Sequence, residues 1–472
     1  MPTWMLVFWA FVLTAIGLIG GADQTQDPEG EQTRLLIEGT TEVRSAYWAY
    51  TRSRAYGAVE LIATRQAAMT MARLARETNS PQAWRRLALT RFMLEAGDWR
   101  SALLTLRTAS PPRPLAEVDR ELALWRVVLE KPRYRWPYDS RRRDTVVNEA
   151  RSFVESLDLG WFRYAALAAL YENSGSERVG ERYRDLALRS TDRLTIAALI
   201  VVLVGLGGLG IWFTLLFGRL VLGRSAIRLH MSSFDPLSAD HARSLTLAAA
   251  AYFAGMVLVR MLPGLLPQAA LERLASDAGL RSAVTAVAVA LSLVPPLLVL
   301  RATGFIVSPG RAGIGLVRLR PARDLAAGLL GHASLLPLLA ITLIISSQLF
   351  EPSASRVNPA IEEFASGSSV LSRFILLIAG AVLAPIVEEV AFRGILMRAL
   401  QAQLGTIWAI LISSAVFAIL HPQLPMGFLS IFALGAGFAV LYRVTGSLWP
   451  AIIAHAVNNT LVFVYLALML AD

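Results

Sequence analysis

Six polar side chains near the C-terminus lie inside strongly apolar stretches, where charged and polar groups are rarely found. They are Glu388, Glu389, Arg393, His421, His455 and Asn459. An ionisable group in the hydrocarbon of a bilayer costs about 2.5 to 3.5 kcal/mol on insertion scales, so membrane segments exclude such groups unless they have partners or a task. Carboxylates, imidazoles and an amide together can accept, hold and donate protons, which general acid–base catalysis requires. We therefore predict that the six residues form one catalytic site.

The two adjacent carboxylates in APIVEEVAFRG are expected to have different environments. Arg393 follows Glu389 by four positions, the favourable helical order for an ion pair, so it can neutralise and hold that carboxylate. Glu388 lies about 100° further round the helix and can face a different neighbour. Pro385 is expected to kink or restart the helix just before the pair. One carboxylate is then structural, and the other is left for work as a base.

The histidines occur at helical spacings in two later apolar segments. Phe417 and His421 are one helical turn apart, and Pro422 ends the helix directly after the imidazole. His455 and Asn459 are separated by four positions and share one helix face. Asn458 lies off that face and ranks lower as a candidate.

Each of these residues also has a structural explanation when it is taken alone. A Glu–Arg pair can be a buried ionic bridge. A single membrane histidine more often bonds a neighbouring helix, which is our prediction for His332. The occurrence of acids, histidines and an asparagine in three of four consecutive apolar segments favours one catalytic site over separate structural contacts.

The three motifs in this order resemble a known family. They are EExxxR (Glu388, Glu389, Arg393), FxxxH (Phe417, His421) and HxxxN (His455, Asn459). Together they resemble the CAAX-prenyl-protease and bacteriocin-processing family of intramembrane endopeptidases, also called type II CAAX endopeptidases, over roughly residues 370 to 470. The resemblance implies hydrolysis of a peptide bond within or near the membrane.

The six residues can perform such a reaction in two ways. In the first hypothesis Glu388 is the general base that activates water, and Arg393 holds Glu389 as support. His421 positions the water, and His455 and Asn459 stabilise the oxyanion. In the second, zinc is ligated by Glu388, His421 and His455 and lowers the pKa of its bound water. The sequence leaves both open.

Composition indicates an integral membrane protein. The chain has 472 residues, 55% of them hydrophobic and only 17% charged, with a mean hydropathy of +0.51. The absence of cysteine excludes disulfides, thiolate nucleophiles and Cys-ligated zinc. The net charge of +10 comes largely from the N-terminal third and from residues flanking apolar stretches, so we expect no nucleic-acid partner.

Hydropathy divides the chain into four parts. Residues 1–22 are predicted to be a signal peptide or signal anchor, and residues 23–192 a soluble helical domain without a membrane span. Residues 193–369 are predicted to be transmembrane helices of unknown role, and residues 370–472 the protease core. Within the soluble domain, 82–109 and 161–190 each resemble a helical hairpin with a glycine at its turn, as in tetratricopeptide units or an irregular helical bundle.

We expect an all-α polytopic protein with about eight spans. The predicted spans are 194–218, 245–265, 282–300, 325–349, 372–391, 407–421, 427–442 and 449–470. Arginines cluster in the loops after the first and third spans, which places both loops in the cytoplasm. These assignments predict a multi-pass protein of the cell membrane with residues 23–192 outside the cytoplasm.

The predicted spans create one geometric difficulty. They put Glu388 and His455 near the inner ends of their segments but His421 at the outer end of its own. Fourteen helical residues would then separate His421 from the others by about 20 Å. Either the sixth segment sits deeper in the membrane, or the short sixth and seventh segments form a re-entrant pair.

Two other functional classes fit parts of the pattern. A non-proteolytic scaffold or bacteriocin-immunity-type protein would use the polar cluster only to hold helices together. A transporter would use the carboxylates as a proton relay, but it would be expected to show inverted repeats, and none is visible. For a protease, the expected partners are the lipid bilayer, a membrane-anchored peptide or protein substrate, and a protein bound by residues 23–192.

Overall fold

The structure is a computed structural model in which every regular element among the described residues is a helix. It describes residues 40–52, 57–130, 140–220, 237–305, 313–316, 319–350, 358–366 and 369–470. The predicted signal segment, 1–22, lies outside the described residues. The contacts divide the chain into two compact units, built mainly from residues 27–199 and 200–464.

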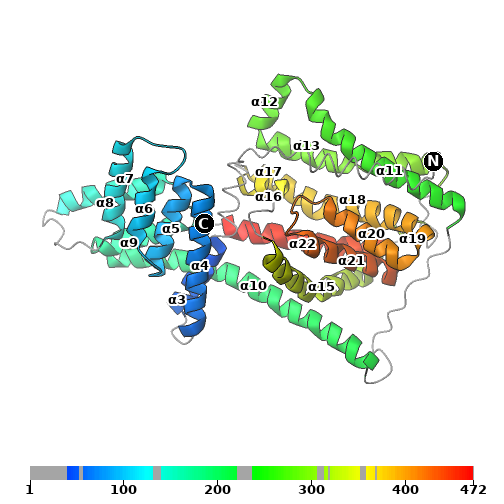
Figure 1. The fold of residues 1–472 in the computed structure, drawn as a ribbon, viewed down its shortest axis with the longest axis horizontal. Helices are drawn as coiled ribbons and strands as arrows, with labels where there is room; N and C mark the ends of the chain where they lie inside the picture. The colour runs from blue at the N-terminus through cyan, green and yellow to red at the C-terminus, as the bar shows by residue number, and fades with distance from the viewer. Residues whose placement is uncertain are drawn as a thin grey trace. The chain divides into compact units, whose positions relative to one another are not determined.

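The first unit is a bundle of helices (Figure 1), two of which begin at capping side chains. Ser80 accepts a hydrogen bond from the backbone N–H of Ala83 at the start of α5, and Asp98 caps α6 in the same way. The elements are α3 (Thr40–Arg52), α4 (Gly57–Thr78), α5 (Pro81–Met93), α6 (Trp99–Leu104), α7 (Leu115–Leu129), α8 (Ser140–Ser156), α9 (Phe162–Asn173) and the beginning of α10 (Glu177–Leu220).

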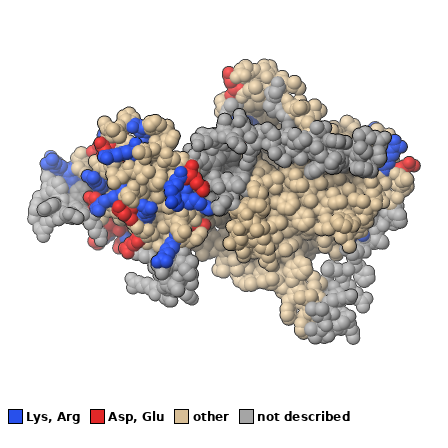
Figure 2. All heavy atoms as spheres, viewed as in Figure 1, with Lys and Arg blue, Asp and Glu red and all other residues tan. Residues whose placement is uncertain are grey.

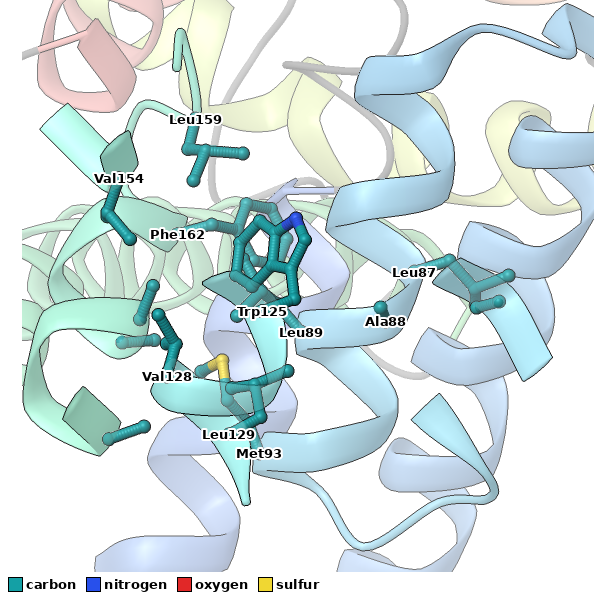
Figure 3. Close-up of a cluster of buried hydrophobic side chains, with 14 of the residues drawn as sticks. Leu87, Ala88, Leu89, Met93, Trp125, Val128, Leu129, Val154, Leu159 and Phe162 are labelled. Carbon is teal, nitrogen blue, oxygen red and sulfur yellow. The ribbon is translucent and has the colours of Figure 1, made fainter. Parts of the chain in front are cut away.

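The core of this unit is aromatic and aliphatic (Figure 3). Trp125, Trp161 and Phe162 are all at most 1% exposed. Trp161 and Phe162 meet edge to face with ring centroids 5.3 Å apart, a favourable aromatic geometry. Large rings buried from several helices give the unit a hydrophobic core of its own.

Both predicted hairpin turns are present. Gly97 and Gly175 have φ values of 138° and 83°, which glycine adopts without strain, and a new helix begins two residues after each of them. The helix after Gly175 does not end near 190. It continues as α10 to Leu220, because no proline interrupts it and the single Gly180 near its start is tolerated in a helix. The tetratricopeptide-like alternative stays a prediction.

Long apolar helices, all but the first and last of them wholly in the second unit, make this a multi-pass membrane protein. Among the described residues, seven helical segments are long and apolar enough to cross a bilayer, and Thr406–Ile419 is a shorter apolar helix. The seven are Glu177–Phe217, Ala239–Val259, Ala278–Ala302, Pro321–Leu349, Val370–Leu404, Phe428–Thr445 and Leu448–Met469. In Figure 2 the coloured charged groups concentrate on the first unit and are sparse on these helices. The sidedness of the membrane stays a prediction.

The helices of this second unit have the following bounds. They are α11 (Ala239–Met261), α12 (Gln268–Ser276), α13 (Ala278–Leu291), α14 (Val294–Ala302), α15 (Pro321–Leu349), α16 (Pro359–Ser366), α17 (Val370–Ile378), α18 (Ala384–Glu389), α19 (Arg398–Leu404), α20 (Thr406–Ile419), α21 (Phe428–Thr445) and α22 (Leu448–Leu470). Two π-helical segments, η5 (Ala379–Leu383) and η6 (Val390–Met397), join α17, α18 and α19 into one continuous rod.

One buried carboxylate anchors the first unit. Glu121 on α7 accepts hydrogen bonds from Arg85 at 2.7 and 2.8 Å and from the Trp125 indole at 3.2 Å, and it pairs with Arg113 at 2.8 Å. Burial alone would raise the pKa of Glu121, but the hydrogen bonds and positive charges of Arg85 and Arg113 outweigh burial and lower it. The cluster ties α5 and α7 to the loop before α7.

We predict that Glu121→Gln destabilises the first unit by about 3 to 5 kcal/mol, because it leaves buried arginines uncompensated. The measurement is thermal unfolding of the detergent-solubilised full chain followed by tryptophan fluorescence. Glu149→Gln is the matched control, since Glu149 pairs with Arg120 on the surface and its loss should cost at most about 1 kcal/mol. Equal effects of the two substitutions would contradict the anchoring role.

The same carboxylate should make stability depend on pH. Because the pKa of Glu121 is lower in the folded state, its contribution is complete above the unfolded pKa of about 4.3. The contribution is lost as pH falls through the folded pKa. The difference in melting temperature between wild type and Glu121→Gln should therefore shrink below about pH 4. A difference that stays constant down to pH 3 would overturn this prediction.

Candidate active site

The predicted ion pair between Glu389 and Arg393 is present and fully enclosed. Arg393 Nη1 donates to Glu389 Oε1 at 3.0 Å, and the two side chains are 1% and 0% exposed. Arg393 Nη2 donates to the carbonyl of Gly435 on α21 at 3.0 Å. The guanidinium therefore joins the α18–η6 rod to α21.

Aromatic rings surround the same guanidinium. Its carbon lies 4.6 Å from the ring centroid of Phe417, 5.6 Å from that of Phe438 and 6.0 Å from that of Phe392. These rings attract the cation through their π faces and replace part of the water that it has lost. A side chain at Gly435 would lie 3.1 Å from Ser414 Cβ, so glycine permits the close approach of α20 and α21.

His455 on α22 lies against both glutamates. Its Nδ1 is 2.9 Å from Glu389 Oε1, and its Nε2 is 3.7 Å from Glu388 Oε2. The ring stacks on Phe438 with centroids 4.9 Å apart. Because a carboxylate oxygen accepts, Nδ1 of His455 is the donor to Glu389, and the other ring nitrogen, Nε2, faces Glu388.

Glu389 and Glu388 differ in exposure and in hydrogen bonding, as expected if one is structural and the other is a base. The Glu389 side chain is 0% exposed, whereas that of Glu388 is 25% exposed. The Glu388 carboxylate has no hydrogen bond to another described residue. One carboxylate is thus sealed and held, and its neighbour is accessible and uncommitted.

His421 joins this group, so the predicted separation of about 20 Å is wrong. Its ring centroid is 4.5 Å from that of Phe417, and the ring of His455 contacts the same phenyl group at 5.9 Å. His421 also lies within electrostatic range of Glu388. Its Nδ1 is bonded to the Phe417 carbonyl at 2.7 Å, which leaves Nε2 for other partners.

The depth error came from ending the fifth span too early. The span was predicted over 372–391, but the rod runs from Val370 to Leu404, which places Glu388 near its middle. Gly405, with φ 78°, then reverses the chain into α20. Gly405 lies 17 positions after Glu388 and 16 before His421, so this antiparallel turn returns His421 to the height of Glu388.

The side chain of Asn459 supplies a hydrogen bond to the π-helical segment η5. The Ala384 N–H bonds the Ala379 carbonyl five residues earlier. The next bond of that pattern, from position 385 to Gly380, cannot form because Pro385 has no N–H. Asn459 Nδ2 donates to the Gly380 carbonyl at 2.8 Å instead. One of its two amide hydrogens remains for another acceptor.

Comparison with known proteins locates this cluster within a family. Residues 370–461 match the family model described as "Type II CAAX prenyl endopeptidase Rce1-like", and all six predicted site residues lie inside this range. Residues 370–461 form an Rce1-like domain. No solved structure matches the chain.

A relative supports the same class of protein. A Bacillus subtilis (strain 168) protein called "Putative membrane peptidase YdiL" is 38% identical over 90 residues, which is 19% of this chain. The match spans only 36% of the length of that relative. Together with the Rce1-like domain, this match supports a membrane protease in general.

The Rce1-like domain does not present the predicted zinc ligands as a ready site. No group of three or more His, Cys, Asp or Glu side chains among the described residues is placed to hold a metal ion. His455 Nδ1 and His421 Nδ1 bond a carboxylate and a carbonyl, contacts that histidine ligands of a metal also make while Nε2 binds the ion. The zinc hypothesis with Glu388, His421 and His455 therefore stays a prediction, and no step below uses a metal.

Sequence reasoning missed the groups that enclose the Rce1-like site. The residues missed are Phe392, Gly435 and Phe438, whose types carry no chemical signal of their own.

The prediction that His332 bonds a neighbouring helix was wrong, because both of its ring nitrogens lack a hydrogen-bond partner among the described residues although the side chain is buried.

We predict that Asn459→Ala lowers the stability of the Rce1-like domain by about 1 to 3 kcal/mol, because it leaves the Gly380 carbonyl without a partner. Unfolding by dodecyl sulfate titration measures the effect. Asn458→Ala is the control, since among the described residues the side-chain amide of Asn458 donates only to Asn459. A smaller loss for Asn459→Ala than for Asn458→Ala would refute the structural role.

Proposed function

We propose that the chain is an intramembrane endopeptidase that uses Glu388 to activate water. The observation that carries the proposal is the contrast between the sealed Glu389, fixed by Arg393, and the accessible Glu388, with His455 in reach of both. Paired carboxylates in different environments allow one to stay ionised while the other exchanges a proton. Membership of residues 370–461 in the Rce1-like family supports peptide-bond hydrolysis as the reaction.

In the proposed reaction, water lies beside the Glu388 carboxylate and the free Nε2 of His421. Glu388 removes a proton while the water oxygen bonds to the peptide carbonyl carbon, and the carbonyl oxygen becomes an oxyanion. The proton can pass to His455 Nε2, 3.7 Å from Glu388 Oε2, because catalytic contacts are often long before substrate binds. Protonated His455 and the second amide hydrogen of Asn459 stabilise the oxyanion.

Collapse of the tetrahedral intermediate completes the reaction. The carbon–nitrogen bond breaks, the bonding pair stays on nitrogen, and the proton taken from water goes to the leaving amine. Glu389 and Arg393 do not exchange protons in this scheme. They hold the Nδ1 side of His455, so that its Nε2 stays directed at Glu388.

The proposed substrate is a membrane-anchored peptide or protein, because the site lies among apolar helices in the middle of a long span. We further propose that the chain lies in the cell membrane with residues 23–192 outside the cytoplasm, where they bind a protein partner. The arginine-rich loops support this orientation.

We predict that Glu388→Gln abolishes proteolysis, with a loss of at least about 1,000-fold, while the protein folds normally. New N-terminal peptides in membranes of cells expressing the wild type are compared with those from cells expressing the variant. Glu272→Gln, in the exposed part of α12, is the control. A non-proteolytic scaffold or immunity-type protein instead predicts identical peptides and a lower melting temperature for Glu388→Gln.

We also predict that chelation leaves proteolysis unchanged, because the described side chains do not gather into a metal site. A synthetic peptide spanning the cleaved junction is incubated with purified protein after dialysis against 1,10-phenanthroline. Loss of cleavage that zinc restores would instead favour the zinc hypothesis with Glu388, His421 and His455 as ligands.

A further inference from the structure

A cleft of about 460 Å³ lies between α7 and α8 in the first unit. These two helices pack against each other (Figure 1), and residues of both line the cleft, together with the loop before α7 and Arg85 of α5. The volume falls in the range of about 300 to 1,000 Å³ that is typical of ligand pockets. None of the lining residues belongs to the Rce1-like domain. The cleft is therefore a candidate binding site separate from the candidate active site.

One part of the cleft is apolar. Leu124, Phe153 and Leu157 line it, and all three residues are partly exposed. The Phe153 ring meets the Trp125 ring edge to face, with centroids 5.6 Å apart, and Trp125 is 0% exposed. Because the Phe153 ring rests on the buried core, it gives an incoming apolar side chain a fixed surface to pack on. This part of the cleft favours a ligand with an apolar group.

Another part of the cleft holds an arginine with unused donors. Arg113 Nη1 pairs with Glu121 Oε2 at 2.8 Å, but its Nε and Nη2 have no hydrogen-bond partner among the described residues. The Nε–Nη2 edge presents two N–H groups whose spacing matches the two oxygens of a carboxylate. The Arg113 side chain is 24% exposed, so it can turn this edge toward a ligand, as side chains at binding surfaces commonly do. The unused edge favours a carboxylate as the ligand group.

The buried charges leave this part of the cleft positive. Glu121 accepts hydrogen bonds from Arg85 at 2.7 and 2.8 Å, and it also pairs with Arg113. Two arginines thus share one carboxylate, and one positive charge of this cluster remains without a negative counterpart. A carboxylate supplied by a ligand would balance that charge where water is partly excluded and attraction is strong.

Two other carboxylates line the cleft outside this cluster. Glu149 pairs with Arg120 at 3.2 Å, and Glu117 is exposed, as Glu149 is. Water and salt screen the repulsion between exposed acids and an incoming carboxylate. The donors of Arg113 are therefore the stronger influence on an anionic ligand.

We propose that this cleft binds the C-terminal end of a peptide, with the terminal carboxylate on the Nε–Nη2 edge of Arg113 and an apolar last side chain against Phe153. A chain end fits better than a passing segment, because its carboxylate and last side chain are attached to the same carbon, and one cleft holds both the cation and the apolar surface. A cleft of this size also encloses only a few residues. The inference deepens the proposed binding of a protein partner by residues 23–192 and rests on that proposal.

The experiment measures the fluorescence anisotropy of dansyl-labelled peptides titrated with the full chain in lipid nanodiscs. The probes are dansyl-Gly-Ala-Leu with a free carboxylate, the same peptide as an amide, and dansyl-Gly-Asp-Leu-amide, whose carboxylate is on a side chain. The free acid should bind at least about 10-fold more tightly than either amide, because only its carboxylate is attached beside the last side chain.

Substitution of Arg113 tests the proposed contact directly. Arg113→Lys keeps a positive charge beside Glu121 but removes the edge with two donors, so affinity for the free acid should fall about 10-fold, to that of the amide. Arg120→Lys is the matched control, because Arg120 lines the same cleft but pairs with Glu149 on the surface, and its affinity should stay within about twofold of the wild type. Glu388→Gln should bind the free acid as tightly as the wild type.

Several outcomes overturn the inference. Equal binding of the free acid and its amide by the wild type does so, as does equal binding of the free acid and the aspartate peptide, which removes the requirement for a chain end. Equal losses in Arg113→Lys and Arg120→Lys show only a general effect of charge. If Arg113→Lys does not fold, the comparison of the three peptides on the wild type decides alone.

Failure of this inference is distinguishable from failure of the proposed function. Cleavage lost in Glu388→Gln without acid-specific binding overturns the inference and leaves the proposed proteolysis standing. Acid-specific binding with identical peptides from wild type and Glu388→Gln supports the inference and overturns only the proteolysis. The proposed protein partner fails separately, if cross-linking in membranes captures no protein on residues 23–192.

Discussion

The buried pair of Glu389 and Arg393 is the interaction on which the site depends. Neither side chain reaches solvent, and removing one partner of such a pair typically costs about 3 to 5 kcal/mol. Each group is therefore held by neighbours. The carbonyl of Gly435 and three aromatic rings surround Arg393, and His455 bonds Glu389 Oε1, whereas Glu389 Oε2 is buried without a hydrogen-bond partner among the described residues. These requirements fix the rod, α20, α21 and α22 against one another.

Satisfying Glu389 also determines the chemistry of its neighbour. Because Glu389 holds Nδ1 of His455, the other ring nitrogen faces Glu388. Arg393 donates its hydrogen bonds to Glu389 and to the Gly435 carbonyl, and no described arginine forms an ion pair with Glu388. An uncommitted, partly accessible carboxylate in an apolar surrounding is suited to exchange protons. The ion pair of Glu389 with Arg393 and the separate position of Glu388, the proposed base, thus both follow from the EExxxR spacing on one helix.

The rod that carries Glu388, Glu389 and Arg393 contains two π-helical segments, η5 directly before α18 and η6 directly after it. The first arises where Pro385 cannot donate to Gly380, and Asn459 supplies the missing hydrogen bond. This contact joins α22 to the rod at Gly380, about two turns before Glu388. π-Helical turns are costly in isolation and occur often at functional sites, and here the cost is offset by a side chain of the HxxxN motif.

Spacing along the sequence was enough to predict the ion pair and the all-helical membrane architecture, because i, i+4 contacts and apolar length are local properties. The catalytic roles of the six site residues stay a proposal. It did not predict the depth of His421, which depends on where Gly405 reverses the chain. It also missed Gly435 and Phe438, because a glycine carbonyl or an aromatic ring contributes to a site only through its position. Those positions are set by packing between helices whose contacting residues are 42 and 66 positions apart in the sequence, which only the tertiary structure decides.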